Sequence, residues 1–342
     1  SRTFLDIRVS LNMEYSSWLY SIFFLSPRQT ELNITMTKVF IDGSAGTTGL
    51  RIAGRLSERA DISLITLPEE LRKDTCARKE ALNDADVSFL CLPDAAAIEA
   101  VGLVENPRTV VIDTSTAHRV SPGFTYGFPE IAGLREKIAR AHHIANPGCH
   151  ASGFIALVAP LVENGLLNKN AFLSCFSLTG YSGGGKKMIA QYEAPDRSPL
   201  LAAPRQYGLS QAHKHLPEMQ KLCGLTAPPV FCPVVADYYS GMEVTVTVSK
   251  NDAASREAIC GCYKEYYKNG LVRFVEDADE EGFLSAAKLA GRDDMELSVY
   301  GNEERLLLVS RFDNLGKGAS GAAIQNMNLA LGLHEATGLV IG

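Results

Sequence analysis

The residue of this chain best suited to covalent chemistry is Cys149, in the segment Ile-Ala-Asn-Pro-Gly-Cys-His-Ala-Ser-Gly at 144–153. Pro147-Gly148 predicts a bend, and the Ala-, Leu- and Val-rich residues that follow predict a helix. Peptide dipoles at a helix N-terminus favour a thiolate, so this position predicts a lowered thiol pKa and a nucleophile. A free cysteine is more often inert and buried, which is our interpretation of the other cysteines, at 76, 91, 175, 223, 232, 260 and 262.

A nucleophilic thiol needs a partner that moves protons, and histidine is the usual one. His213 and His215 lie in His-Lys-His-Leu-Pro-Glu at 213–218, before a helix that Pro217 predicts, with Glu218 close enough to orient one imidazole. His150 adjoins Cys149, but neighbours on a turn usually point apart. Surface histidines are the alternative for this pair. We expect no metal, because no cluster of Cys, His or acidic residues nearby completes a site.

A cofactor signal lies in the turn at 43–49, Gly-Ser-Ala-Gly-Thr-Thr-Gly, between an expected strand and an expected helix. Glycines permit a tight turn and a close backbone approach, and a helix N-terminus offers N–H groups to a pyrophosphate. The spacing is GxxGxxG rather than GxGxxG, and packing alone can also require such a turn. We predict a dinucleotide site formed by Gly43, Ser44, Gly46, Thr47, Thr48 and Gly49.

The end of the second strand decides between NADP and NAD. NAD enzymes usually place an acidic residue there to bind the ribose 2′-hydroxyl. Here the strand ends at Leu67-Pro68, and Glu69 is followed a turn later by Arg72 and Lys73. The basic side chains suit a 2′-phosphate and favour NADP, while Glu69 keeps NAD open.

The segment Tyr-Ser-Gly-Gly-Gly-Lys-Lys at 181–187 predicts a flexible cationic loop. Its backbone N–H groups and a lysine, Lys186 or Lys187, would suit an anionic substrate. A plain hairpin turn is the alternative.

Strands expected at 39–41, 62–67, 87–92 and 110–113, with helices between them, predict right-handed βαβ units and a parallel sheet. After Cys149 a helix is expected at 154–166. Strands of a second sheet follow, joined by long loops that suit an active-site domain, at 173–178, 230–235, 243–248 and 305–312. The fold class is α/β, with a dinucleotide-binding domain at 36–148, an α+β domain at 149–313, and a helix from Asn314.

The composition supports an ordinary globular enzyme. The chain has 342 residues, with 33 Lys and Arg against 39 Asp and Glu, and this length predicts about two domains. A net charge of −6 makes nucleic acid an unlikely partner. Cysteines without paired spacing indicate a reducing compartment, so we expect a cytoplasmic protein. With 46% hydrophobic and 21% charged residues, the composition predicts no membrane bundle. Residues 1–35, with a short apolar run at 18–25, form an expected leader outside the fold, and Met36 is the expected functional start. A signal peptide is the alternative, although Asp6 and Glu14 upstream of the run argue against it.

Taken together, the motifs carry a family resemblance. Those at 42–50, 146–149, 180–186 and 213–218 are joined by Asp-Thr-Ser-Thr-Ala-His-Arg at 113–119 and Asp-Asn-Leu-Gly-Lys-Gly-Ala-Ser-Gly-Ala-Ala at 313–323. In this order they resemble the N-acetyl-γ-glutamyl-phosphate reductases of type 2, within the semialdehyde/glyceraldehyde-phosphate dehydrogenase group. The resemblance runs from about residue 38 to 331. His150 is a mild departure, since many members have Tyr there.

The resemblance implies a Rossmann-type domain, a substrate and dimerisation domain, and a C-terminal helix at 314–342 that returns to the first domain. It implies NADPH-dependent reduction of N-acetyl-L-glutamyl 5-phosphate to the 5-semialdehyde in arginine biosynthesis, through a Cys149 thioester. The implied acid/base is His215, with His213 as the alternative. Arg119 and Ser115 would bind phosphate or carboxylate. The remaining implied contacts are Lys186 or Lys187 with the substrate, Ser182 with cofactor or substrate, and Asn314 with the nicotinamide amide.

Two other functions stay open. A sibling enzyme such as aspartate-β-semialdehyde dehydrogenase would use the same chemistry on another acyl phosphate. A nucleotide sensor without catalysis would keep the fold but leave Cys149 unreactive. Sheets like the expected second one commonly pair between subunits, so a homodimer or homotetramer is expected.

Overall fold

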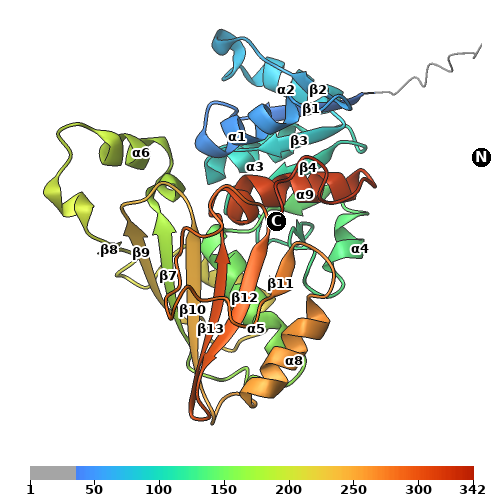
Figure 1. Cartoon of the computed structure of the whole chain (residues 1–342). Helices are drawn as coiled ribbons and strands as arrows, with labels where there is room; N and C mark the ends of the chain where they lie inside the picture. Colours follow the sequence, from blue (N-terminus) through green and yellow to red (C-terminus); the bar gives the residue numbers. More distant parts are fainter. Residues whose placement is uncertain (1–35) are drawn as a thin grey trace, which may run out of the picture. The chain divides into compact units, whose positions relative to one another are not determined.

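The computed structural model of the chain describes residues 36–342, so the expectations for residues 1–35 lie outside the described residues. Two sheets organise this part of the chain, one above the other in Figure 1. In the part described, no helix is both long and apolar enough to cross a membrane.

The first sheet is fully parallel, in the strand order β2-β1-β3-β4-β6-β5. The predicted parallel sheet is therefore confirmed. Its strands are β1 (Thr37–Asp42), β2 (Ile62–Ile65), β3 (Val87–Leu90), β4 (Val110–Asp113), β5 (Thr125–Tyr126) and β6 (His143–Ala145). Carboxyl ends of parallel strands meet at one edge, where ligands of such sheets bind. The loops after β1, β4 and β6 therefore emerge together.

Alternation along β1 explains why helices cover both faces of this sheet. Val39 and Ile41 pack with α1 (Thr47–Leu56) and α4 (Leu134–Ile138), whereas Phe40 packs with α2 (Thr75–Asp84) and α3 (Asp94–Leu103). A 3₁₀ turn, η1 (Glu69–Leu71), precedes α2.

The second sheet is mixed, in the order β11-β12-β13-β10-β7-β9-β8. The predicted strands correspond to β7 (Ser174–Gly180), β9 (Val230–Ala236), β10 (Met242–Ser249) and β13 (Arg305–Phe312), with small differences at the ends. The sequence did not predict β8 (Arg205–Gln206), β11 (Val272–Phe274) or β12 (Met295–Gly301). The buried residues of one face pack on α5 (Cys149–Glu163), α7 (Leu216–Leu222) and α8 (Arg256–Tyr266).

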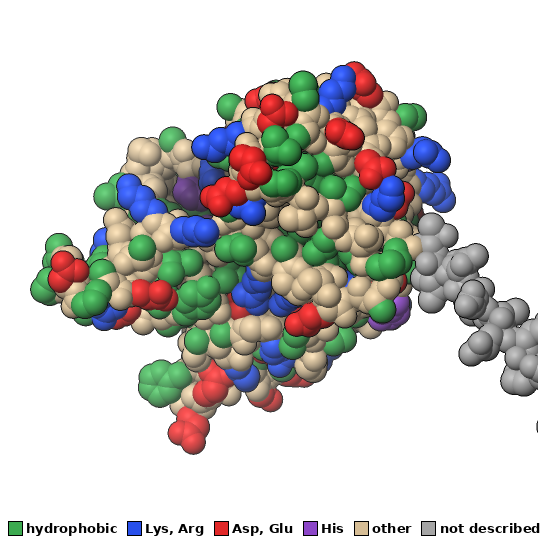
Figure 2. All heavy atoms as spheres, turned by 90° about the horizontal axis from the view of Figure 1, so that it is seen from above, with side chains coloured by type: hydrophobic (Ala, Val, Ile, Leu, Met, Phe, Trp, Pro, Cys, Tyr) green, Lys and Arg blue, Asp and Glu red, His purple; other side chains and the backbone are tan. Residues whose placement is uncertain are grey.

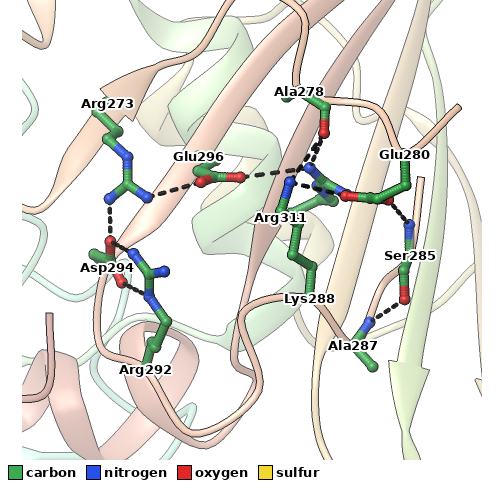
Figure 3. A network of polar contacts seen from close by, with 10 residues as sticks. All are labelled: Arg273, Ala278, Glu280, Ser285, Ala287, Lys288, Arg292, Asp294, Glu296 and Arg311. Atoms are coloured by element: carbon green, nitrogen blue, oxygen red, sulfur yellow. Dashed lines mark hydrogen bonds and ion pairs between the residues drawn. The ribbon is translucent and has the colours of Figure 1, made fainter. Parts of the chain in front are cut away.

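An ion-pair network explains how acidic residues at the start of β12 and just before it are buried (Figure 3). Glu296 accepts from Arg273 at 2.7 Å, and Asp294 accepts from Arg292 at 2.8 Å. Arg311 of β13, 1% exposed, donates to Glu280 at 2.8 Å and to the carbonyl of Ala278. Each buried charge thus has a partner of opposite sign, which burial requires.

The chain ends by crossing back to the first sheet. Instead of one helix from Asn314, a π-helical turn, η4 (Gly316–Ser320), precedes α9 (Gly321–Ala330), and residues 331–342 are not helical. Ala323, Ile324 and Met327 complete the cluster that contains Val39 and Ile41. The predicted return of this helix is therefore confirmed (Figure 1), and its extent to residue 342 was wrong.

A buried ion pair fixes the π-helical turn. Lys317 donates to both carboxylate oxygens of Glu130, at 2.7 and 2.8 Å, and to Gln325 at 2.6 Å. Burial alone would raise the pKa of Glu130, but Lys317 and Gln325 hold it below its ordinary value. The Lys317 and Glu130 side chains are 1% and 0% exposed, so neither charge has water to replace a lost partner.

Lys317→Met is therefore expected to lower the free energy of unfolding by about 3–5 kcal/mol, because Glu130 stays buried without its cation. Urea denaturation measures the loss. Lys250→Met is the control, since Lys250 and Glu304 pair with side chains 55% and 58% exposed, and it is expected to cost about 0.5 kcal/mol or less. Equal losses for the two variants would contradict the assignment.

Candidate active site

The loops at the ends of both sheets enclose a cavity of about 450 Å³. Its walls include Cys149, His215 and Arg119, together with Thr47 and Asn314. Figure 2 shows the molecule hollowed where a histidine side chain is visible, with Lys and Arg side chains gathered around it. Residues separated widely along the chain therefore meet in one place.

Cys149 is the first residue of α5, preceded by Gly148 as the N-cap. Gly148 has no room for a side chain, because a Cβ there would lie 2.4 Å from Nη1 of Arg119 and 2.5 Å from Nε2 of His215. The glycine thus lets the guanidinium and the imidazole approach the backbone directly beside the thiol.

The expected lowering of the Cys149 pKa was wrong. Burial raises the pKa of this thiol, and it outweighs the opposing effects of Arg119, the His150 N–H and Lys214. A helix N-terminus favours the thiolate only as far as desolvation allows. The thiol therefore needs a base beside it. Burial also raises the pKa of Cys91 to about 12, in agreement with a structural role.

The rate of Cys149 alkylation by iodoacetamide is expected to rise with pH through a midpoint above about pH 8.5, the value of an ordinary thiol. A raised pKa means less thiolate at neutral pH, and the thiolate is the reacting form. Peptide mass spectrometry resolves Cys149 from the exposed Cys76, which serves as an internal reference. A midpoint below pH 8 would contradict this expectation and restore the original prediction.

His215 caps the N-terminus of α7 and is 5% exposed. Burial, together with the nearby Arg119 guanidinium, holds the pKa of His215 well below its ordinary value. Its Nδ1 is buried and has no hydrogen-bond partner among the described residues. The imidazole is therefore neutral at pH 7 and able to accept a proton.

His213 lies beside His215, with ring centroids 4.7 Å apart. Its Nδ1 accepts the backbone N–H of His215 at 3.2 Å, which turns this ring toward the helix start. Burial, with Lys214 second, lowers the pKa of His213 too. Both imidazoles line the cavity.

Glu218 does not orient either of these histidines, contrary to the expectation. It accepts from Arg119 at 2.8 Å, from the Tyr126 hydroxyl at 2.6 Å and from the Gly148 N–H at 3.1 Å. The carboxylate, 1% exposed, therefore fixes the guanidinium and the nucleophile turn to each other.

His150 lines the same cavity as Cys149, and its two ring nitrogens are held by other partners. Its Nδ1 lies 2.7 Å from Ser177 Oγ and its Nε2 lies 2.6 Å from the Tyr207 hydroxyl. Burial lowers the pKa of His150 to about 3, so the ring stays neutral.

Of the other residues predicted to bind substrate, Ser182 and Arg119 line the cavity of Cys149 and Ser115 does not. Ser182 lines the cavity, and its hydroxyl accepts from the Asn314 amide at 3.0 Å. Arg119 also donates to the carbonyl oxygens of Asn146 and Thr114, at 3.0 and 3.2 Å. Ser115 does not line the cavity, because its hydroxyl donates to Asp113 at 2.8 Å.

A second cavity, of about 620 Å³, lies at the carboxyl ends of β1 and β2. Gly43 and Ser44 line it, and Gly43 has a φ of +85°. A Cβ at Gly43 would lie 2.3 Å from the carbonyl oxygen of Cys91, and one at Gly49 would lie 2.5 Å from that of Gly43. These two glycines let the turn close tightly. Gly46 is the N-cap of α1.

The N-terminus of α1 connects the two cavities, since Thr47 and Thr48 line the smaller one. The Thr47 hydroxyl is buried without a hydrogen-bond partner within the described part of the chain. A tight backbone turn, a helix N-terminus and an unpaired hydroxyl fit a pyrophosphate. The larger cavity, lined also by Glu69, Arg72 and Lys73, fits an adenosine with a 2′-phosphate.

Lys186 lines the larger cavity rather than the one that contains Cys149, and Lys187 lines neither. The segment that contains them is not a loop, because it forms a 3₁₀ turn, η2 (Tyr181–Gly184), and α6 (Gly185–Glu193). Sequence reasoning gave no role to Lys214 or Tyr207, which line the cavity of Cys149. Lys214 lies between the two predicted histidines, and this position in the sequence could have indicated that it lines the same cavity.

Across residues 36–342, no group of three or more His, Cys, Asp or Glu side chains is arranged to hold a metal ion.

Comparison with known proteins identifies two family models. A semialdehyde dehydrogenase NAD binding domain matches residues 55–141, and a semialdehyde dehydrogenase dimerisation domain matches 149–314. N-acetyl-gamma-glutamyl-phosphate reductase 2 of Nostoc sp. is 43% identical over 320 residues, covering 88% of this chain and 99% of that protein. The N-acetyl-gamma-glutamyl-phosphate reductase of Burkholderia lata is 45% identical over 307 residues, covering 87% and 97%.

Solved structures share the fold at low identity. Aspartate semialdehyde dehydrogenase II of Vibrio cholerae, complexed with ASA, aligns with a TM-score of 0.67 at 16% identity, over 86% of this chain and 98% of that one. Aspartate semialdehyde dehydrogenase of Candida albicans, with NADP, aligns with a TM-score of 0.62 at 16% identity over the same shares.

Proposed function

Because this chain belongs to the N-acetyl-γ-glutamyl-phosphate reductase family, we propose that it reduces N-acetyl-L-glutamyl 5-phosphate with NADPH. The products are N-acetyl-L-glutamate 5-semialdehyde and phosphate, a step of arginine biosynthesis. The observation that carries the proposal is the single cavity that contains Cys149, His215 and Arg119 beside the N-terminus of α1.

Cys149 is the proposed nucleophile. Its sulfur attacks the acyl carbon, the bond from that carbon to the phosphate oxygen breaks, and a thioester forms. The neutral His215 takes the thiol proton as the attack proceeds and passes it to the departing phosphate, so that no free thiolate has to accumulate. His213 remains the alternative base.

The second half of the reaction releases the aldehyde. NADPH supplies a hydride when bound. Once the thioester carbon is reduced, His215 would pass a proton from solvent to the oxygen, and a thiohemiacetal would form. The carbon–sulfur bond then breaks, and the hydroxyl proton returns through His215 to the sulfur. The cycle thus consumes one hydride and one proton for each aldehyde.

Arg119 and Lys214 are the proposed anion ligands, because both are cationic side chains that line the cavity. Glu218 holds the Arg119 side chain in one conformation before the substrate binds. Binding therefore costs little further conformational entropy of this side chain. Ser115 would act indirectly, by shaping the loop after β4 through Asp113. Ser182 and Asn314, hydrogen-bonded to each other, would face the nicotinamide.

NADP is the proposed cofactor in preference to NAD. Arg72 and Lys73 line the larger cavity near the end of β2 and would face a 2′-phosphate. Glu69 lines the same cavity and is the feature that would favour NAD.

An assay in the reverse direction tests the function. N-acetylglutamate 5-semialdehyde, NADP and phosphate should yield NADPH, and omission of phosphate should stop it, since phosphate releases the acyl group from Cys149. Aspartate semialdehyde is the comparison that separates the sibling enzyme. Faster turnover with aspartate semialdehyde would transfer the chain to that activity, and no turnover with either would favour a nucleotide sensor.

We assign residues 36–148 to the cofactor domain, 149–313 to the catalytic and dimerisation domain, and 314–342 to the segment that packs on the first. A biosynthetic reductase with free cysteines suits the reducing cytoplasm.

A homodimer through the second sheet is the proposed assembly, and a homotetramer would need a further contact. The face of this sheet opposite α5 exposes apolar side chains on β7 and β13, the two strands that flank β10, with Phe176 45% and Leu307 42% exposed. Phe176 lies directly across from Thr245 in the register. A second copy would cover this surface. Sedimentation equilibrium tests the assembly, and a monomer at micromolar concentration would contradict it.

A further inference from the structure

The start of α6 lies beside the start of α1, although the two helices follow different sheets. A Cβ built on Gly185 would lie 3.9 Å from the Thr47 hydroxyl. Gly185 has a φ of +72°, a left-handed conformation that side chains other than glycine rarely adopt. This turn therefore brings the next residue, Lys186, to the N-terminus of the cofactor-site helix.

Lys186 is the only residue from beyond the first sheet and its helices that lines the larger cavity, among the described lining residues. The rest of that wall comes from residues 40–92 and includes Gly43, Ser44 and Ala45 of the glycine turn. The preceding residues, Ser182 to Gly185, line the smaller cavity instead. Gly185 thus lines the smaller cavity, and the next residue, Lys186, lines the larger one.

The charge of Lys186 is available to a ligand. Within residues 36–342 its ammonium group makes no ion pair and no side-chain hydrogen bond. It lines the same cavity as the turn before α1, whose backbone N–H groups favour an anion. A cation and a helix N-terminus that meet at one cavity wall suit a phosphate group.

We infer that Lys186 binds the pyrophosphate of the dinucleotide, and not the acyl-phosphate substrate. The inference rests on the proposed function for the identity of the cofactor. It assigns the 2′-phosphate to Arg72 and Lys73 and the pyrophosphate to Lys186, so the two groups of cations have separable effects. The cofactor then contacts the beginning of α6 directly, and with it the segment that forms part of the substrate wall.

The experiment measures the dissociation constants of NADPH and NADH by nicotinamide fluorescence, in the wild type and in Lys186→Met. The two nucleotides share the pyrophosphate and differ in the 2′-phosphate. Lys186→Met is expected to weaken both by a similar factor, about five- to tenfold, the size of one charged hydrogen bond. Lys187→Met, one position along on the same exposed helix and on neither cavity wall, is the control and should change neither constant.

Arg72→Met provides the contrast, with NADPH weakened and NADH unchanged. A Lys186→Met protein that binds both nucleotides like the wild type would overturn the inference, and a raised KM for the acyl phosphate alone would return Lys186 to the substrate. Weakening of NADPH only would move the contact to the 2′-phosphate and also overturn it. A wild type that binds neither nucleotide would instead overturn the proposed function, and the inference with it.

Discussion

Cys149→Ser is expected to lower turnover by about 10⁴-fold or more while NADPH binding persists. A serine hydroxyl is far less acidic than a thiol, and the neutral His215 cannot ionise it to a useful extent. Serine should fit the site, because it keeps the Cβ of Cys149 and replaces the sulfur with a smaller oxygen. That Cβ packs closely on Gly318, where an added Cβ would lie only 3.0 Å away. The measurement pairs the semialdehyde, NADP and phosphate assay with a fluorescence titration of NADPH.

Cys76→Ser is the matched control, because Cys76 is exposed and lies on neither cavity wall. It should retain wild-type turnover. If Cys149→Ser kept more than a few per cent of activity, the covalent route would be excluded, because a direct hydride transfer to the acyl phosphate does not require the sulfur. If it lost NADPH binding as well, the defect would be structural and the thiol would lose its assigned role.

His215→Asn is expected to lower kcat by about 10²- to 10⁴-fold, the usual effect of removing a general acid/base. Its Nε2 lies near the backbone of Gly148, and its Nδ1 has no partner within residues 36–342, so no hydrogen bond to the protein holds the ring in one protonation state. Asn keeps a similar size without a group that titrates. His213→Asn is the internal comparison, and it should cost roughly tenfold or less.

The pH dependence separates the two histidines further. The pKa of His215 is lowered, so the imidazole is neutral and able to act as a base down to pH values well below 6.5. The activity of the wild type should therefore fall only at pH values well below 6.5, where His215 becomes protonated. In His215→Asn this acid-side fall should be absent. A larger loss of kcat in His213→Asn would exchange the roles of the two residues.

Features that depend on neighbours in sequence were predictable. The Gly43 turn, the helix start at Cys149 and the helix after His215 each follow from residues a few positions apart. The body of the helix expected at 154–166 was misplaced by a few residues, since α5 spans Cys149–Glu163. The strand at 305–312 was predicted with its observed bounds, since a continuous apolar run, Leu-Leu-Leu-Val, follows Arg305. Such patterns act through local backbone preferences, and they remain visible in one sequence.

Features that depend on distant partners were not predictable. Glu218 and Arg119 are separated by 99 positions in the sequence, and no pattern in the residues around either one predicts their hydrogen bond. Strand β12 contains Glu296, whose burial is acceptable only because Arg273 and Arg311 reach it (Figure 3). The Cys149 pKa depends on the desolvation of the whole cavity, whereas the sequence shows only the helix start.

The return of α9 to the first sheet also constrains synthesis. A ribosome releases β1 to β6 long before residues 321–330 leave the exit tunnel, and until then the partners of Val39 and Ile41 in their apolar cluster are incomplete. The nucleotide-binding half therefore completes its apolar core only after residues 321–330 have emerged. A product terminated before Gly321 would present this unfilled surface to chaperones and proteases, so such chains should be cleared and not accumulate as partly active enzyme.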